Sequence, residues 1–305
     1  MSVKEGLESS IVHFDGEVFR QPAARGGLLE FFTRLIHARL AGIGLVIVVV
    51  FVLAAVLAPV ISPYSPTEQH VTNKLKPPSA EHWLGTDELG RDILSRVVYG
   101  GQSSLSVGIL AVSVALGLGT LLGLVAGYWS NSLIDALIMR AMDALLAFPV
   151  LILALALVAA LGASVRNVII AVSIVGIPTY ARLTHGQVLS VKERDFVQAA
   201  QTVGARDMRI ILRHILPNVT APLIVQASIG VAFAILTEAA LSFLGLGVQP
   251  PTPSWGFMLS AGNGYLDYDP WLIFGPGMAI FLCVLGFNFL GDGVRDVLDP
   301  RMQNQ

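Results

Sequence analysis

The segment from residue 82 to residue 96 holds the densest group of side chains that could do chemistry in this chain. Four of them are of types that bind metal ions: His82, Asp87, Glu88 and Asp92. Arg91 and Arg96 lie in the same segment, close enough in sequence to neutralise the carboxylates. A structural role is therefore favoured over a metal site: the turn Gly85-Thr86-Asp87 caps a short amphipathic helix on the membrane surface.

A further carboxylate, Glu238, lies inside an apolar run. It follows Ala221 by seventeen residues, which is about 25 Å along a helix. A carboxylate within a membrane usually faces the bundle interior or a water-filled cavity. Two roles stay open for Glu238: a tie to a neighbouring helix, which we favour, and a lining position on a water-filled pathway.

Composition places the chain among integral membrane proteins. Of its 305 residues, 54% are hydrophobic and 13% are charged, and the mean hydropathy is +0.71. The single cysteine, Cys283, excludes a disulfide framework, and a net charge of −2 without a basic patch gives no nucleic-acid signal. The sequence has no GxxxxGK[ST] string and no clustered nucleophile or acid–base pair, so we expect neither an enzyme nor a bound cofactor.

Six apolar runs have the length of a membrane-spanning helix, and their Leu, Val, Ala and Gly content favours an all-α fold over a barrel. The predicted spans are Ala41–Ile61, Ser103–Trp129, Ala144–Leu161, Val168–Thr184, Ala221–Gly247 and Trp271–Leu290.

The distribution of Lys and Arg predicts the orientation. With the N-terminus in the cytoplasm, the inside segments hold fourteen of these residues and the outside segments five. Both termini are therefore expected in the cytoplasm. The predicted organisation is a tail over 1–39, a first span over 40–62, an outer loop with a short helix over 63–102, a transmembrane core over 103–292 and a tail over 293–305.

Ionisable and aromatic residues near the membrane have simple expected roles. Arg140 and Asp143 are three residues apart, a spacing that allows a pair within one helix. Arg182 and His185 end the fourth span, where their side chains would extend to lipid headgroups. Trp255 follows a proline cluster and is expected to anchor an outer loop at the membrane interface.

The core includes a polar cytoplasmic segment, 194–217, which predicts two short helices with Gly204 in a turn between them. Helical spacing gives each helix an apolar face: Phe196, Ala199, Ala200 and Val203 in the first, and Met208, Ile211, Leu212 and Ile215 in the second. The second helix also carries arginines on another face, toward water, lipid headgroups or a partner: Arg206, Arg209 and Arg213.

This segment resembles the EAA loop of ABC importer permeases in the spacing of Gln198-Ala199-Ala200 before Gly204 and of Leu216-Pro217 after it. The resemblance implies that the segment docks onto a cytoplasmic ATPase. The implied coupling residues are Gln198, Ala199, Ala200, Gly204, Ala205, Arg206, Met208 and Arg209. Gln198 stands where the family pattern has Glu, and His214 where it has Ile. Gln198 is uncharged, so it does not make the ion pair that this Glu usually makes.

Three more strings, 82–96, 245–256 and 287–300, resemble the dipeptide/oligopeptide permease family of ABC importers, in its second-permease subtype. The resemblance implies the type I importer permease fold with six transmembrane helices, in a bacterial inner membrane. Implied partners are a homologous second permease, two cytoplasmic ATPase subunits, an extracytoplasmic solute-binding protein and the lipid bilayer, with no nucleic acid. The implied substrates are peptides; alternatives are another small solute such as glutathione, a nickel complex or an opine, or an ion-driven transporter. In this setting Glu238 is a candidate gate residue.

Overall fold

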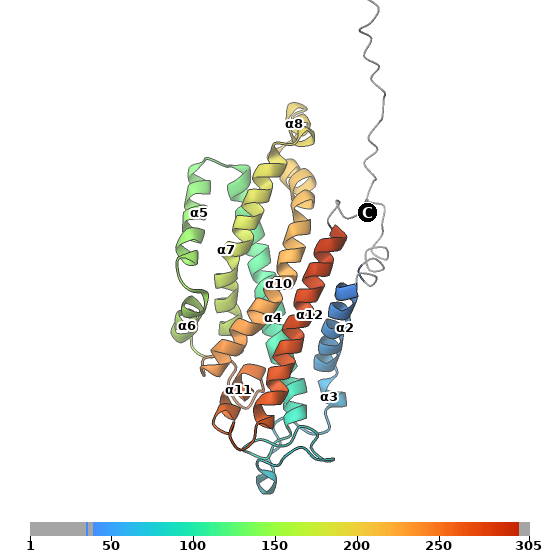
Figure 1. Cartoon of the computed structure of the whole chain (residues 1–305). Coiled ribbons are helices and arrows are strands. Elements are labelled where there is room, and N and C mark those ends of the chain that lie inside the picture. The colour runs from blue at the N-terminus through green and yellow to red at the C-terminus, as the bar shows by residue number, and fades with distance from the viewer. Residues whose placement is uncertain (1–34, 36–38, 299–305) are drawn as a thin grey trace, which may run out of the picture.

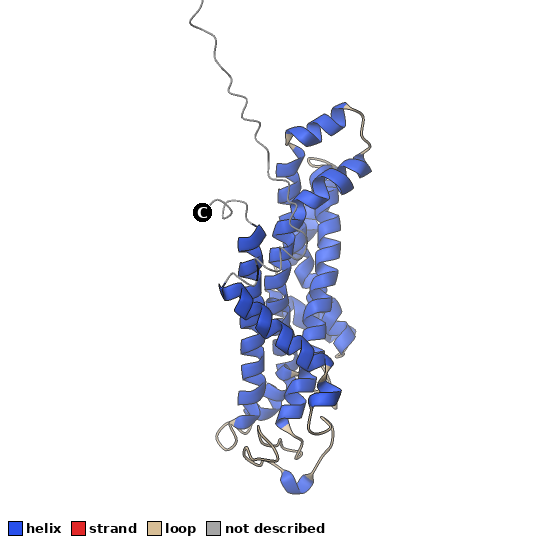
Figure 2. Cartoon of the chain, turned by 90° about the vertical axis from the view of Figure 1, so that its right-hand side faces the viewer, coloured by secondary structure: helices blue, strands red, loops and turns tan. Residues whose placement is uncertain are grey.

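The computed structural model describes Leu35 and residues 39–298, and every regular element in that part is a helix. Figures 1 and 2 show a bundle of long helices, with irregular loops gathered at one end and α8 at the other. The bounds in chain order are α2 Arg39–Val56, α3 Ala58–Ile61, a 3-10 turn Val71–Asn73, α4 Ile93–Tyr128, α5 Leu133–Leu146, α6 Val150–Leu161, α7 Val165–Lys192, α8 Asp195–Thr202, α9 Asp207–Ile210, a π-helical turn Ile211–Ile215, α10 Leu216–Phe243, α11 Trp255–Asn263 and α12 Trp271–Leu298.

Four helical runs are long and apolar enough to cross a membrane: α4, α7, the run Asp207–Phe243 that includes α10, and α12. The bent pair α5 and α6 makes a fifth only if the two count as one span. The apolar part of α2, Leu40–Val56, is shorter. The described residues therefore contain four or five candidate spans and one shorter apolar helix, where the sequence predicted six spans.

The third span, predicted over Ala144–Leu161, is not one continuous helix. α5 ends at Leu146, α6 begins at Val150, and the two helices are bent by 94°. Pro149 stands at the break. A proline has no N–H to donate and disfavours helical geometry in the residue before it, so the chain cannot continue one helix through this point.

The short amphipathic helix predicted after Asp87 is also wrong. α4 begins at Ile93 and continues for 36 residues, so the first turns of this long helix occupy the end of the expected outer loop. Its N-cap is Asp92, whose carboxylate accepts a hydrogen bond from the Ser95 backbone N–H at 2.7 Å. At the other end of the chain, α12 runs to Leu298, beyond the predicted core boundary at 292. The predicted tails lie mostly outside the described residues.

α4 and α7 pack closely along a row of glycines on α4. A Cβ on Gly123 would lie 2.4 Å from the Ala181 carbonyl oxygen, and one on Gly127 would lie 2.7 Å from the Val188 Cβ. Gly119 meets α7 in the same way one turn earlier. Such spacing of small residues lets two membrane helices approach backbone to backbone. These two helices therefore form a tightly joined pair in the middle of the bundle.

Trp255, the predicted interfacial anchor, is buried instead. Only 1% of it is exposed, and its Nε1–H donates to the Val97 carbonyl on α4 at 2.8 Å. Its ring meets the edge of Phe51 on α2, with 5.8 Å between centroids. An indole whose N–H finds a partner is stable in a protein interior. The prediction of an interfacial anchor was therefore wrong: the Trp255 side chain lies in the interior, where its hydrogen bond joins α11 to α4.

Candidate functional site

The segment 194–217 forms two short helices joined at Gly204, as the sequence predicted. Gly204 has φ +78°, the left-handed region that glycine adopts without penalty. Around it, the Ala205 N–H donates to the Ala200 carbonyl at 3.0 Å, and the Gly204 N–H donates to the Gln201 carbonyl at 2.9 Å. This pair of hydrogen bonds is the Schellman ending of a helix. The turn directs the chain from α8 into α9.

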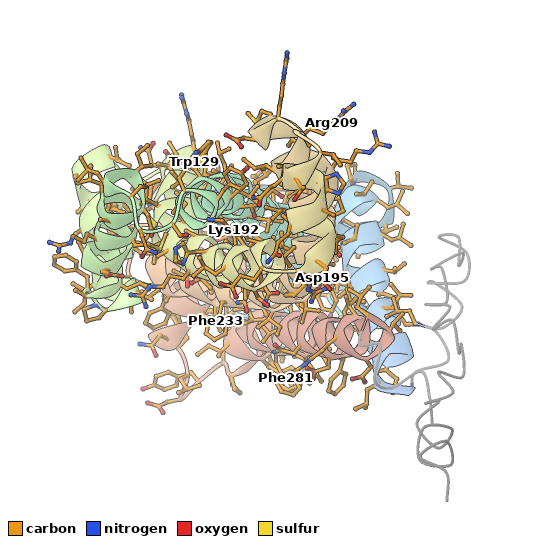
Figure 3. All side chains as sticks on the ribbon, turned by 90° about the horizontal axis from the view of Figure 1, so that it is seen from above. Trp129, Lys192, Asp195, Arg209, Phe233 and Phe281 are labelled. Carbon is orange, nitrogen blue, oxygen red and sulfur yellow. The ribbon has the colours of Figure 1, made fainter. Side chains whose placement is uncertain are left out.

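Most of the coupling residues implied by the resemblance lie on the surface of this segment. Gln198, Ala199, Gly204, Arg206, Met208 and Arg209 are exposed, Ala205 is half-buried and Ala200 is buried. Figure 3 shows Arg209 at the edge of this end of the molecule. The apolar side chains beside them are open as well: Val203 is 83% exposed, Met208 65% and Leu212 57%. We call Val203, Met208, Arg209 and Leu212 the loop tip.

The buried residues of the two short helices match the predicted apolar faces only in part. In α8 the buried residues are Val197 and Ala200, while Phe196, Ala199 and Val203 are exposed. In the second helix Ile211 and Ile215 are buried as expected, but Met208 and Leu212 are exposed. A π-helical turn over Ile211–Ile215 shifts the register there, because it places more residues in one turn than an α-helix does.

Two contacts of acidic side chains join α5 to α7: an ion pair with an arginine and a hydrogen-bonded contact with a histidine. Asp143 pairs with Arg182, and Asp135 Oδ1 lies 3.0 Å from His185 Nε2. The predicted pair of Asp143 with Arg140 is therefore wrong, and so is the headgroup role of Arg182 and His185. Sequence spacing could not reveal these pairs because 39 and 50 residues separate the partners.

In the segment 82–96, arginines pair with Asp87, as the sequence predicted, whereas Asp92 pairs with His82, which was not predicted. Asp87 Oδ2 lies 2.6 Å from Arg91 Nε and 3.4 Å from Arg96 Nε. Asp92 Oδ1 lies 3.0 Å from His82 Nδ1. All five side chains are nearly buried. Within the described residues, no three His, Cys, Asp or Glu side chains are arranged to hold a metal ion.

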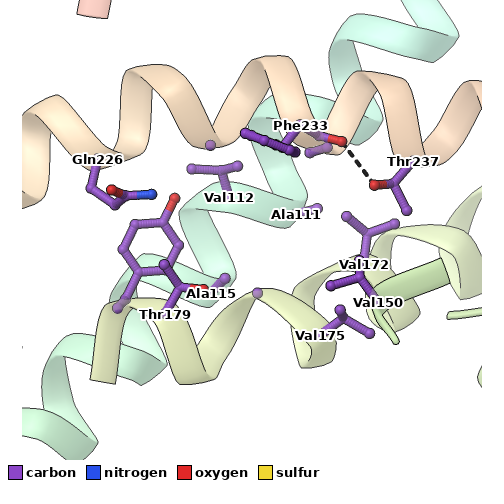
Figure 4. Close-up of a pocket in the computed structure, with 14 residues that line it drawn as sticks. Ala111, Val112, Ala115, Val150, Val172, Val175, Thr179, Gln226, Phe233 and Thr237 are labelled. Carbon is purple, nitrogen blue, oxygen red and sulfur yellow. Dashed lines mark hydrogen bonds between the residues drawn. The ribbon is translucent and has the colours of Figure 1, made fainter. Parts of the chain in front are cut away.

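A cavity of ≈ 330 Å³ lies between α4, α6, α7 and α10. Figure 4 shows Gln226 and Thr237 at opposite ends of the α10 face that borders it, with the Thr237 hydroxyl donating to the Phe233 carbonyl at 2.8 Å. None of the residues that line it is charged, in the structure as described. The lining residues are Ala111, Val112, Ala115, Val150, Val172, Val175, Gly176, Thr179, Tyr180, Gln226, Gly230, Phe233, Ala234 and Thr237.

The shape of this cavity depends on one close approach between α7 and α10. A Cβ on Gly230 would lie 2.2 Å from the Tyr180 hydroxyl oxygen, so only glycine leaves room for the phenol. Tyr180 is 3% exposed. The cavity can accept polar ligands only through neutral groups: the hydroxyls of Tyr180, Thr179 and Thr237 and the amide of Gln226.

Glu238 is fully buried and does not line this cavity. Its Oε1 accepts a hydrogen bond from the Ser242 hydroxyl at 2.6 Å, whereas its Oε2 has no hydrogen-bond partner among the described residues. Its immediate neighbour on α10, Thr237, does face the cavity. Thr237 therefore lies on the face of α10 that borders the cavity, whereas Glu238 lies on another face of the same helix. This placement favours the structural role of Glu238 over the pathway role.

The structure separates the predicted site residues into two places. The expected coupling residues lie at the end of the bundle where α8 is (Figure 1), whereas Glu238 lies five residues before the end of α10, toward the opposite end of that helix. Sequence reasoning missed Tyr180 and Gln226 at the cavity, since single polar residues within spans carried no spacing signal. The close α4–α7 packing could have been predicted from Gly119, Gly123 and Gly127, which recur every fourth residue.

Two family models match the chain. The model described as binding-protein-dependent transport system inner membrane component matches residues 119–304, and the N-terminal TM domain of oligopeptide transport permease C matches residues 28–78.

Curated relatives match nearly the whole length. The dipeptide transport system permease protein DppC of Alkalihalophilus pseudofirmus is 50% identical over 90% of this chain and 90% of its own. The di/tripeptide permease DppC of Pseudomonas aeruginosa is 46% identical over 91% of this chain and 93% of its own. The glutathione permease GsiD of Pectobacterium atrosepticum is 41% identical over 94% and 95%, respectively.

The fold is also found among solved structures. One of them shows inward-facing conformations of the MetNI methionine ABC transporter, and its matching chain superimposes with a TM-score of 0.58 at 17% identity. The match covers 68% of this chain and 98% of that chain. At this identity the likeness concerns the arrangement of the helices and not the ligand.

Proposed function

The chain belongs to the family of binding-protein-dependent transport system inner membrane components, and from this premise we propose that it is one of two permease subunits of a bacterial ABC importer for short peptides. It lies in the inner membrane and crosses it six times, with α2 and the bent α5–α6 pair as two of the crossings. Both termini face the cytoplasm, in agreement with the Lys and Arg distribution. The segments assigned to the outside are near one end of the bundle and α8 is at the other (Figure 1).

The loop tip is the observation that carries this proposal. Outside the bilayer, exposed apolar side chains such as Val203, Met208 and Leu212 are stable when a partner covers them. The Gly204 turn projects them beyond the helix ends, and Arg209 adds a charge that a partner can pair with. We assign this surface to a cytoplasmic ATPase subunit, which hydrolyses ATP in place of this chain.

The cavity between α4, α6, α7 and α10 is assigned to the translocation pathway, which this chain completes with a homologous second permease. A short peptide at neutral pH carries a charge at each end and amide groups between them. Hydroxyls and an amide bind such amide groups weakly, and an uncharged wall holds neither terminus by an ion pair. Passage without tight binding leaves selection to an extracytoplasmic solute-binding protein.

Peptide substrates are favoured because relatives of 50% and 46% identity are named as dipeptide and di/tripeptide permeases. Glutathione, itself a tripeptide, is the second candidate, since a relative named as a glutathione permease is 41% identical. For Glu238 we propose a structural role, because it does not border the cavity. Its hydrogen bond is to Ser242 on its own helix and not to the neighbouring helix that the sequence predicted, so it supports the end of α10 and the loop that follows.

Transport by the whole complex tests this function. The complex of this chain with its ATPase subunits, second permease and binding protein would be reconstituted in liposomes, and uptake of labelled dialanine, trialanine and glutathione measured with and without ATP. Uptake of at least one of these that requires ATP and the binding protein supports the proposal. Uptake driven by a proton or sodium gradient without ATP would contradict it.

A matched pair of variants tests the loop tip in the same assay. Met208→Glu places a charge on the exposed apolar surface and should prevent the ATPase subunits from co-purifying with the permease. Val71→Glu places the same charge in the loop region at the other end of the molecule, where Val71 is 69% exposed, and should leave the ATPase subunits bound. The proposal fails if the ATPase subunits remain bound to the Met208→Glu permease.

A further inference from the structure

A side-chain hydrogen bond joins the cytoplasmic segment to the end of α4. The Tyr128 hydroxyl donates to Asp207 Oδ1 at 2.6 Å, across 79 residues of sequence. Tyr128 is the last residue of α4 and Asp207 is the first residue of α9. A phenol that donates to a carboxylate makes one of the shorter and stronger hydrogen bonds available to proteins. The bond is therefore a direct link between the segment that bears the loop tip and a central helix.

Lys192, the last residue of α7, fixes the other side of this link. Its Nζ donates to the Tyr128 carbonyl at 2.7 Å and to the Ser130 hydroxyl at 3.2 Å. The same ammonium lies 5.7 Å from the centre of the Tyr128 ring. A cation at this place satisfies a carbonyl that the end of α4 leaves free and stabilises the helix dipole. Figure 3 shows Lys192 near the middle of this end of the bundle.

The link reaches the cavity through a closely packed pair of helices. The glycine row from Gly119 to Gly127 brings α4 against α7 with no space for a side chain between them. The same two helices supply more than half of the cavity wall, among them Ala115 from α4 and Tyr180 from α7. Movement of Tyr128 therefore displaces two walls of the cavity together, because dense packing transmits displacement rather than absorbing it.

Other connections of the segment run mainly through its own neighbours in sequence. α8 follows the end of α7 by two residues, and α9 leads through the π-helical turn into α10. Buried Ile210 and Ile211 add apolar contact in the same core cluster as Tyr128. Apolar contact is non-directional and permits sliding, whereas a short hydrogen bond fixes both distance and direction.

We propose that Tyr128 is a positioning residue, which through its hydrogen bond to Asp207 and its contact with Lys192 transmits movement of the cytoplasmic segment to the α4–α7 pair. This inference rests on the proposed function, in which an ATPase moves the loop tip. When the segment moves as a unit with α9, the Tyr128 hydroxyl follows Asp207, and Lys192 makes the end of α7 follow the end of α4. The cavity then changes shape in step with ATP hydrolysis.

The experiment measures how ATP hydrolysis changes the cavity, without need of a known transported solute. Thr237→Cys places a thiol in the cavity wall of the reconstituted complex, and its rate of reaction with a soluble maleimide is measured with and without ATP plus vanadate. Native Cys283 is fully buried and makes little background. ATPase activity is measured on the same samples.

Tyr128→Phe removes one hydroxyl and keeps the ring. In the Thr237→Cys background it should leave ATPase activity within about twofold while lowering the ATP-dependent change in labelling rate by about tenfold, as expected for loss of a hydrogen bond to a charged group. Asp207→Ala should have the same effect, the double variant should add nothing further, and Asp207→Asn, which keeps an acceptor oxygen, should restore part of the change. Tyr99→Phe makes the same substitution at the other end of α4 and should change neither quantity.

This design distinguishes a failure of the proposed function from a failure of the inference about Tyr128. If the Thr237→Cys complex without other substitutions shows no ATP-dependent change, the proposed function itself fails. If that complex responds and Tyr128→Phe responds equally, the transmission role of Tyr128 is overturned while the proposed function stands. Equal losses of ATPase activity and of the labelling change would also overturn it, because they would indicate a general defect in folding or assembly.

Discussion

Ser242 connects Glu238 to the loop that follows α10. Its hydroxyl donates to Glu238 Oε1 at 2.6 Å, and the same oxygen accepts the backbone N–H of Val248 at 3.1 Å. Glu238 and Ser242 lie one helical turn apart and are both essentially inaccessible. The carboxylate thus orients a hydroxyl that holds the first residues beyond the helix, where Gly245 turns the chain with φ +79°.

Glu238→Gln should destabilise the assembled complex without changing its turnover strongly. The amide keeps an acceptor for Ser242 but adds N–H groups that a fully buried site must satisfy, and an unsatisfied group costs about 1–3 kcal/mol. Thermal unfolding of the purified complex measures this, with ATPase activity recorded below the transition. Ser242→Ala should lower the unfolding temperature in the same direction. A Glu238→Gln complex of normal stability that has lost most of its uptake would support the pathway role instead.

Gly204→Val should uncouple ATP hydrolysis from transport. A β-branched residue resists the positive φ at this turn, so α9 and the loop tip would change direction. A Cβ there would touch nothing within 4 Å, so the expected effect comes from the backbone and not from a clash. Gly264→Val is the control, because Gly264 has φ −73° and equally open space. Wild-type uptake per ATP in the Gly204→Val complex would count against the docking interpretation.

Gly123→Ala should separate α4 from α7. Its Cβ would lie 2.4 Å from a backbone carbonyl oxygen, and overpacking of this kind costs roughly 1–3 kcal/mol. Gly117→Ala, on the same helix, meets nothing within 4 Å and should be neutral or stabilising. The two unfolding temperatures, measured in the same detergent, give the comparison. Equal values would show that the glycine row does not determine how closely these helices pack.

Single cysteines test the orientation. Tyr268→Cys and Val203→Cys replace residues that are 87% and 83% exposed, at opposite ends of the molecule. In whole cells an impermeant thiol reagent should label the first and not the second, and permeabilised cells should label both. Labelling of Val203→Cys alone in intact cells would reverse the assigned topology.

The features that the sequence predicted correctly depend on residues that are close together in the chain. The Gly204 turn followed from the two helical patterns on either side of it, because positive φ and helix ends are properties of a few consecutive residues. The neutralised carboxylates near Asp87 were predictable for the same reason, since Arg91 and Arg96 are close in sequence. Apolar runs likewise predicted that α4, α7, α10 and α12 exist, because a membrane span shows itself in the composition of about twenty residues. Their bounds differ from the predicted ones by up to ten residues, at the start of α4.

The tertiary structure decided which face of each element is buried and which distant partner each polar group finds. Asp143 was expected to pair within its helix, yet it reaches Arg182, because the bend at Pro149 leaves α5 alongside α7. Trp255 was expected to be an interfacial anchor, yet it is buried and its Nε1–H donates to the Val97 carbonyl. An indole is suited to both surroundings, so its sequence position alone could not distinguish them. The Tyr128–Asp207 bond joins residues whose spacing carries no period. Such pairings depend on how the helices pack, and a single sequence specifies that packing only through the whole set of contacts.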